Sequence, residues 1–319
     1  MKDPIKFKID TQDRLINRFE QFNKEYAPIL LDKIFEYIDK FARSKGFLVL
    51  EKNSGFLLGE FAKKLVDDFK NSTYISDIGS LLGNFDELET ANKLLLSVIN
   101  DNFDFDALDF SKEKKLIINE LTESLLRPES FRVNIANDVR KILARNILTG
   151  APIKDLKDEL KRSVISSETG GGILGRYTTQ ITTDAVSQYS GIINDKLAKE
   201  VDLNAIGYLG SIIANSRVQC VRWKDQKGAV LLRKEKIAKL GYLPDEVKWA
   251  NANGQGYGKK GSTSYILLTE ANFMQYRGGY GCRHDAIPFH FDDKYYTRYK
   301  KLKDQYDKET LKNIESQKK

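Results

Sequence analysis

Residues 1–165 repeat one pattern, in which apolar side chains recur every three or four positions among charged ones. Residues 56–70 show it with Phe56, Phe61, Leu65 and Phe69. A recurrence close to the roughly 3.6-residue turn of a helix predicts amphipathic helices, and the strict alternation of half-buried strands is almost absent. Only six prolines occur in 319 residues, which permits long helices. We therefore expect residues 1–165 to form a helical bundle or stalk.

Glycines and prolines predict where these helices begin and end. A helix with apolar positions Ile29, Ile34, Ile38 and Phe41 is expected to have Pro28 in its first turn and to end at Gly46. Gly150 and Pro152 predict another break. Residues 166–175, SSETGGGILG, are expected to form a hinge, because three consecutive glycines disfavour a helix. No Gly-Lys-Ser/Thr sequence follows, which argues against a phosphate-binding loop.

The sequence changes character after a further helix over residues 177–199. The segment 205–213, AIGYLGSII, is rich in β-branched residues and is predicted to be a strand, as are the short segments 228–232 and 264–269. The expected fold is therefore mainly α with a C-terminal α+β domain: a helical N-terminal region, then a small mixed sheet domain over residues 176–293. Residues 294–319 are predicted to form a basic C-terminal helix with nine basic and four acidic residues.

The charge of the chain is uneven. Residues 201–319 hold 22 Lys and Arg against 13 Asp and Glu, a net charge of +9, whereas residues 1–200 hold 30 against 32. This excess indicates a polyanionic neighbour, with nucleic acid as the first candidate, or only a bias towards lysine that aids solubility. On the C-terminal helix, one face is expected to dock on a partner or on the chain's own domain; it carries Tyr295, Tyr299, Leu302 and Tyr306.

No targeting or membrane segment is expected. There is no run of about 20 apolar residues, as a membrane-spanning helix requires, and the N-terminal residues lack the apolar core of a signal peptide. Two cysteines in 319 residues do not make a disulfide scaffold, which favours a reducing cytoplasm during synthesis.

Both cysteines and both histidines of the chain fall within one short region, as Cys220, Cys282, His284 and His290. Two thiolates and one or two imidazoles match a closed tetrahedral zinc site, although the spacing fits no familiar zinc motif. A disulfide between Cys220 and Cys282, formed in a released particle, is a second interpretation. The third is two buried thiols and two hydrogen-bonded histidines in the core of a small domain.

Three sequence elements occur in a particular order around these cysteines. The first is a helix bearing Thr182, Thr183, Ala185 and Ser187. The second contains Arg217, Cys220 and Trp223, followed by a glycine turn. The third is the loop Gly281-Cys282-Arg283-His284-Asp285, followed by Pro288 and Phe289. Over about residues 176–291 they resemble the C-terminal domain of phage head morphogenesis (minor head) proteins of the Mu F-like family. In that family a Pro-x-His-x-x-Cys-Arg-Cys run is usual, whereas here glycines precede Cys282 and a histidine follows it.

The resemblance implies a minor structural protein of a tailed-phage head, associated with the portal vertex and with packaged double-stranded DNA. Such a protein acts in head assembly, and some accompany DNA at ejection. Its partners would be phage portal and capsid proteins, it would be an oligomer within the particle, and it would occur in the virion and, during assembly, in the host cytoplasm. The role would be structural, not enzymatic, with Arg217, Cys220, Trp223, Cys282 and Arg283 as motif residues.

Two alternatives place an active site in the C-terminal domain. One is a metal-dependent nuclease, because His284, Asp285, His290 and Asp292 could activate water or hold a divalent metal. The other is an effector delivered by the virion. Candidate DNA contacts, through stacking and charge, are Tyr257, Lys259, Lys260 and Arg277. The alternative to DNA binding by residues 251–264 is a surface loop with solvated lysines.

Overall fold

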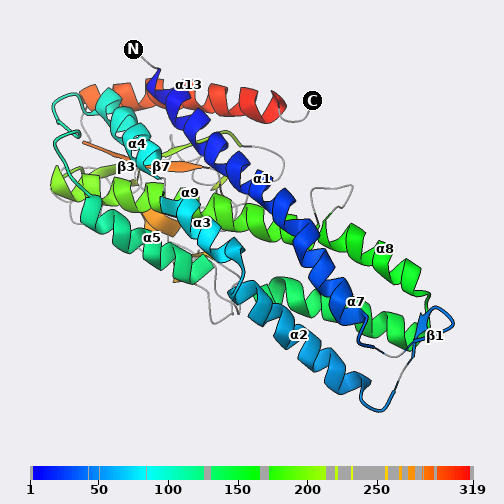
Figure 1. The fold of residues 1–319 in the computed structure, drawn as a ribbon. Coiled ribbons are helices and arrows are strands. Elements are labelled where there is room, and N and C mark those ends of the chain that lie inside the picture. Colours follow the sequence, from blue (N-terminus) through cyan, green and yellow to red (C-terminus); the bar gives the residue numbers. More distant parts are fainter. Residues whose placement is uncertain are drawn as a thin grey trace. The chain divides into compact units, whose positions relative to one another are not determined.

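A computed structural model describes residues 3–41, 43–49, 51–83, 85–125, 131–165, 172–212, 220–221, 231–232, 256–257, 266–267, 272–276, 282, 284–290 and 293–316 (Figure 1). Most of these residues are helical, and small antiparallel sheets lie towards the C-terminus. The expected fold, mainly α with a small C-terminal α+β domain, is confirmed. The described helices are α1 (Pro4–Ile38), α2 (Ser54–Lys70), α3 (Thr73–Gly83), α4 (Asp86–Ile99), α5 (Ser111–Leu125), the π-helix η1 (Arg132–Ala136), α7 (Asn137–Thr149), α8 (Ile153–Val164), α9 (Ile173–Glu200), α12 (Phe273–Tyr276) and α13 (Asp293–Ser316).

The strands are short. They are β1 (Arg43–Ser44), β2 (Phe47–Leu48), β3 (Ala205–Leu209), β4 (Leu231–Leu232), β5 (Gly256–Tyr257), β6 (Ile266–Leu267) and β7 (Asp285–Phe289). Within the described residues, no helix is both long enough and apolar enough to span a bilayer.

Contacts divide the chain into two compact units. Unit 1 comprises Met1–Leu15, Asn84–Ile117 and Thr183–Lys319, and unit 2 comprises Ile16–Gly83 and Ile118–Thr182. These boundaries differ from the sequential domains expected at residues 165 and 176, because α1, α5 and α9 each contribute residues to both units. Of the expected hinge, residues 166–171 lie outside the described part of the chain, and residues 173–175 begin α9.

Unit 2 is built from amphipathic helices whose buried positions follow the helical repeat. On α2 these are Phe61, Leu65 and Phe69, and the Phe69 ring stacks on Phe131 with centroids 3.9 Å apart. Phe56, expected on the same face, lies in the first turn of α2 and is 70% exposed. Likewise Ile34 and Ile38 of α1 are buried, whereas Ile29, expected beside them, is 54% exposed.

The prediction that Pro28 begins a helix and Gly46 ends it is wrong. Pro28 lies inside α1, which ends at Ile38. Pro28 has no backbone N–H, so α1 lacks one hydrogen bond there. Its side chain is exposed, and the helix continues through it for 35 residues in all. Gly46 instead forms, with Lys45, the two-residue loop of the β1–β2 hairpin, where φ is 85° and 49° respectively. Positive φ at both loop residues matches the twist of a tight hairpin, a geometry that favours glycine.

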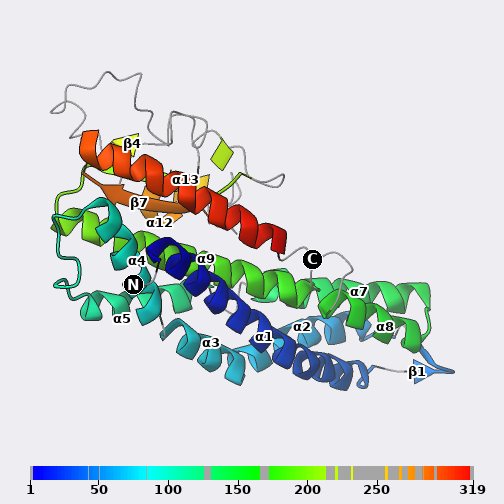
Figure 2. The ribbon, with the colours of Figure 1, turned by 90° about the horizontal axis from the view of Figure 1, so that it is seen from above.

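The three-stranded sheet of unit 1 has the order β4-β3-β7, with antiparallel pairing throughout its described strands. All residues of β3 and β7 are buried. Figure 2 shows why, because β7 lies between α13 and α9. On one side, Gly207 leaves room for the ring of Tyr299, which a Cβ would approach to 2.0 Å. From α9, the Asn194 amide donates a 2.9 Å hydrogen bond to the carbonyl of Ala286.

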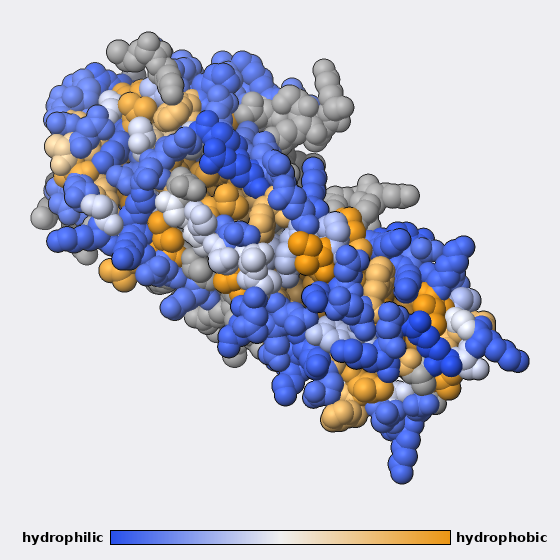
Figure 3. Space-filling view, in the orientation of Figure 1, coloured by the Kyte–Doolittle hydropathy of each residue, from blue (hydrophilic) through white to orange (hydrophobic). Residues whose placement is uncertain are grey.

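Helix α13 packs on unit 1 through the face that its sequence predicted. Tyr295, Tyr299, Leu302 and Tyr306 are all buried. The Tyr299 ring stacks on Phe289 of β7, with centroids 4.7 Å apart. The tyrosine face therefore docks on the chain's own unit. The opposite side of α13 is hydrophilic, and hydrophilic side chains dominate the face of the molecule drawn in Figure 3, with hydrophobic ones gathered in separate clusters.

Candidate metal centre

The pairing of β3 with β7 positions one of the two histidines of the chain. Leu209, the last residue of β3, pairs with Asp285, the first residue of β7. His284 precedes Asp285 and therefore lies beside Gly210, where β3 ends. Gly210 has a φ of 116°, and a Cβ there would lie 2.9 Å from the His284 ring. Glycine at position 210 thus permits both the turn and the close approach of the imidazole.

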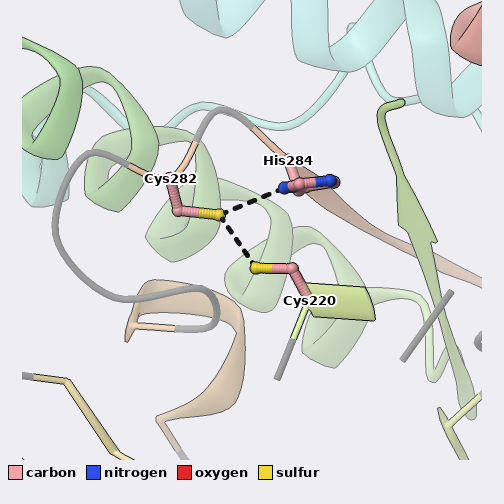
Figure 4. Close-up of side chains that lie close together, drawn as sticks. All are labelled: Cys220, Cys282 and His284. Atoms are coloured by element: carbon pink, nitrogen blue, oxygen red, sulfur yellow. Dashed lines mark hydrogen bonds between the residues drawn. The ribbon is translucent and has the colours of Figure 1, made fainter. Parts of the chain in front are cut away.

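Both cysteines meet His284 at this end of the sheet. The sulfurs of Cys220 and Cys282 are 3.8 Å apart, and the Cys282 sulfur is 3.5 Å from Nδ1 of His284. One donor atom from each of the three residues lies within 4.8 Å of the others. Figure 4 shows the three side chains pointing towards one another from different segments of the chain. No disulfide joins the two cysteines.

Tyr208 completes the cluster, although no sequence pattern predicted its part in it. Its hydroxyl donates a hydrogen bond to the Cys220 sulfur at 3.2 Å and lies 3.4 Å from the Cys282 sulfur. Its ring is nearly parallel to that of His284, with centroids 5.1 Å apart. Burial, and secondarily the two cysteines, raise the pKa of Tyr208 well above its ordinary value of 10.

The surroundings of the cluster are apolar. Cys220 is 2% exposed, Cys282 7% and His284 8%. The two cysteines belong to a hydrophobic cluster that also contains Ile206, Tyr208, Phe273, Met274 and Ala286. Met274 is held there by close packing of α12 on α9, because a Cβ at Gly191 would lie 1.9 Å from the Met274 carbonyl oxygen. A donor set so enclosed can hold a metal ion or form a disulfide, but it gives little access to a large substrate.

His290, the fourth residue of the expected ligand set, lies elsewhere. It follows the last residue of β7, whereas His284 precedes the first. Six residues of extended strand span about 20 Å, so one ion cannot bind both histidines. The backbone N–H of His290 donates to the Asn100 side chain at 3.2 Å, and its ring lies 5.9 Å from that of Tyr295.

Of the remaining expected site residues, one lies in a described strand. Tyr257 belongs to β5, which pairs with β6. The other candidates lie outside the described residues: Arg217, Trp223, Lys259, Lys260, Arg277 and Arg283.

A second buried polar cluster in unit 1 was not predicted from the sequence. Lys8 and Asp285 are both fully buried and form an ion pair at 3.4 Å. The Lys8 ammonium also donates to the side chains of Asn92 and Ser190, at 2.6 and 2.8 Å. The sequence does contain one indication of this cluster. Lys8 lies between Ile5 and Ile9 at helical spacing, on a face that would otherwise be apolar.

Comparison with known proteins identifies no relative. No protein-family model, no curated protein and no solved structure matches this chain.

Proposed function

We propose that this chain is a minor structural protein of a tailed-phage head, which acts at the portal vertex during head assembly and contacts the packaged DNA. The observation that carries the proposal is the 3.8 Å separation of the Cys220 and Cys282 sulfurs. These cysteines belong to separate elements of the Mu F-like resemblance, 62 residues apart in sequence. Because the two cysteines are in contact, the two sequence elements form one structural motif. A domain of the Mu F-like kind would require this.

The helix that opens the resemblance supports the same proposal. Thr182, Thr183, Ala185 and Ser187 all belong to α9. Ala185 is buried, and further along α9 the Asn194 side chain bonds to β7. From Thr183 onwards α9 belongs to unit 1, together with Cys220 and Cys282. All three elements of the resemblance therefore contribute to one compact unit.

The contacts of two nuclease candidates favour a structural role. The His284 ring is buried and faces Cys282, and the buried Asp285 carboxylate pairs with Lys8. A general base must reach water or substrate, and the burial of both side chains against protein partners opposes that role. Asp292, the other carboxylate of the nuclease hypothesis, lies outside the described residues.

The particle role is tested with the phage that carries this gene. We expect mass spectrometry of purified particles to detect the chain at far lower copy number than the major capsid protein, and in heads, not tails. A stop codon early in the gene should yield defective heads, and expression of the gene in trans should restore them. Absence of the chain from purified particles would overturn the proposal.

Contact with DNA is tested by salt dependence. We expect double-stranded DNA to bind the full chain with an affinity that falls steeply from 50 to 200 mM salt, because lysines displace condensed counterions. Replacing the exposed α13 lysines Lys300, Lys301 and Lys308 by glutamine should lower the slope of log affinity against log salt. The slope should fall by about 1 for each phosphate that these lysines neutralise in the wild-type chain.

A charge-matched control separates a site from general attraction. Lys24, Lys52 and Lys63 are exposed lysines of unit 2. Their replacement by glutamine removes the same charge and should leave the slope nearly unchanged. Affinity that does not depend on salt would refute the DNA contact, and equal effects of the two triple variants would refute its location on α13.

A further inference from the structure

We propose that Cys220, Cys282 and His284 bind one zinc ion, through both sulfurs and Nδ1 of the imidazole, as a structural metal site of unit 1. The proposal goes beyond the role in the phage head and does not depend on it. It rests on the distances between the donor atoms, on the charge balance of the buried site and on the hydrogen bonding of Tyr208.

The distances are those of two edges of a zinc tetrahedron. With Zn–S bonds of about 2.3 Å and Zn–N bonds of about 2.0 Å, tetrahedral angles put two sulfurs about 3.8 Å apart and a sulfur and a nitrogen about 3.5 Å apart. The two measured separations are 3.8 Å between the sulfurs and 3.5 Å from the Cys282 sulfur to Nδ1 of His284. A disulfide requires about 2.05 Å between sulfurs, so forming one would need at least one of the two side chains to move.

The charge balance also fits. Zinc binding displaces one proton from each thiol, so that Zn²⁺, two thiolates and one neutral imidazole form a site without net charge, and two protons pass to solvent. Such a site suits residues that are at most 8% exposed, because an uncompensated buried charge is strongly unfavourable. Sulfur and imidazole donors favour zinc over calcium or magnesium, which prefer oxygen.

Tyr208 acts in this site as a positioning residue. Its O–H donates to the Cys220 sulfur, and its ring stacks on the imidazole of His284. Outer groups that hydrogen-bond to metal ligands orient them and tune the affinity for the metal. The fourth coordination position is left to a neutral oxygen donor such as water or a backbone carbonyl, which keeps the site without net charge, because the chain has no third cysteine and His290 lies at the other end of β7.

The first experiment measures metal content. The full chain is purified without a histidine tag under reducing conditions, incubated with excess Zn²⁺, desalted, and analysed for zinc and other transition metals. We expect about one zinc per chain, because a structural site is near full occupancy. His284→Ala should lower the zinc content to the background level, whereas the matched control His290→Ala should retain zinc.

A second measurement does not depend on the folding of a variant. In the wild-type chain, Cys220 and Cys282 should resist alkylation while zinc is bound and react when a strong chelator is added. Tyr208→Phe keeps the ring but removes the O–H, and should weaken zinc affinity 10- to 100-fold in a competition with a chromophoric chelator.

Each other outcome overturns the proposal. Less than about a tenth of an equivalent of zinc after incubation would exclude a structural site, since such sites bind zinc tightly. A Cys220–Cys282 disulfide in peptides from protein isolated without reductant, together with no zinc uptake after reduction, would identify the pair as a redox pair. Equal zinc loss in His284→Ala and His290→Ala would show that the ligand set is wrong. Failure of the zinc site would leave the particle experiment unaffected.

Discussion

Lys8 shows how one side chain can link distant parts of the chain. Its ammonium contacts Asp285 of β7, Asn92 of α4 and Ser190 of α9. The Asp285 carboxylate also accepts hydrogen bonds from the Gln12 amide at 3.0 Å and from the Tyr306 hydroxyl at 3.1 Å. A buried ion pair of this kind adds little net stability when intact, but removing one partner is costly because it leaves a charge in the interior.

We therefore predict that Lys8→Met destabilises unit 1 by about 3–5 kcal/mol, the usual cost of breaking a buried pair. Urea unfolding followed by circular dichroism at 222 nm can measure this, because helices α4 and α13 of unit 1 lose their signal when the unit unfolds. Combining Lys8→Met with Asp285→Asn should recover much of the loss. Lys6→Met, at an exposed position two residues away, serves as the control. A Lys8→Met variant as stable as the control would contradict the prediction.

At the residue scale, the sequence predicted which residues belong to the cysteine–histidine cluster better than it predicted how they are arranged. Cys220, Cys282 and His284 could be named because the chain has so few residues of these types. His290 was grouped with them only because it is near in sequence, and strand geometry separates it. The contact of Tyr208 with the cysteines could not be predicted. The sequence pattern of an apolar strand is the same whether its tyrosine only packs or also donates a hydrogen bond to sulfur.

At the scale of elements, α13 shows what periodicity can and cannot predict. The repeat of its tyrosines identified the buried face, but not the surface that this face covers. That surface exists because Gly207 of β3 has no side chain, which lets the Tyr299 ring pack against the strand. Such complementarity depends on two elements about 90 residues apart in sequence, and single-element patterns carry no information about it.

The N-terminal part of α13 is also fixed by charge. Arg298 and Lys294 both pair with Asp101, in the turn after α4. The hydrogen bond from Arg298, the largest cause, lowers the pKa of Asp101 to about 2 from its ordinary 3.8. Because the folded-state pKa is below the unfolded one, the ionised carboxylate stabilises the fold above about pH 4. This stabilisation is lost as the pH falls through about 2.

We accordingly predict that Asp101→Asn lowers the urea midpoint of unit 1 slightly at pH 6, and that the difference from wild type shrinks between pH 4 and pH 2. The effect should be small and should weaken in high salt, because the pair is solvent-exposed. In an Arg298→Gln background, Asp101→Asn should have less effect at pH 6. A difference that is constant across this pH range would show that Asp101 acts through something other than its charge.

At the scale of the whole molecule, the sequence predicted the classes of element but not their grouping. Periodicity and glycine content indicate where helices give way to strands, and these signals imply domains that follow one another along the chain. The structure instead assigns Met1–Leu15 and Asn84–Ile117 to the same unit as Thr183–Lys319. The reason lies in particular residues such as Asn100, whose side chain donates to the Pro288 carbonyl at 3.4 Å and accepts from the backbone of His290.

This interleaving predicts that the C-terminal part of the chain does not fold alone. A fragment of residues 173–319 keeps β3, β7, α13 and the cysteine–histidine cluster, but it lacks Lys8, Asn92 and Asn100. Asp285 would lose its buried counter-ion, and apolar surface covered by α4 would meet water, so we expect a soluble-expression yield near zero or a molten state with poor amide dispersion in NMR spectra.

Co-expression with residues 1–125 should restore soluble, well-dispersed protein, because that piece supplies the missing segments of unit 1. Residues 16–83 make a matched second partner, drawn from unit 2 alone, and should restore nothing. A well-dispersed spectrum from residues 173–319 by themselves would show that the N-terminal segments are accessory to unit 1.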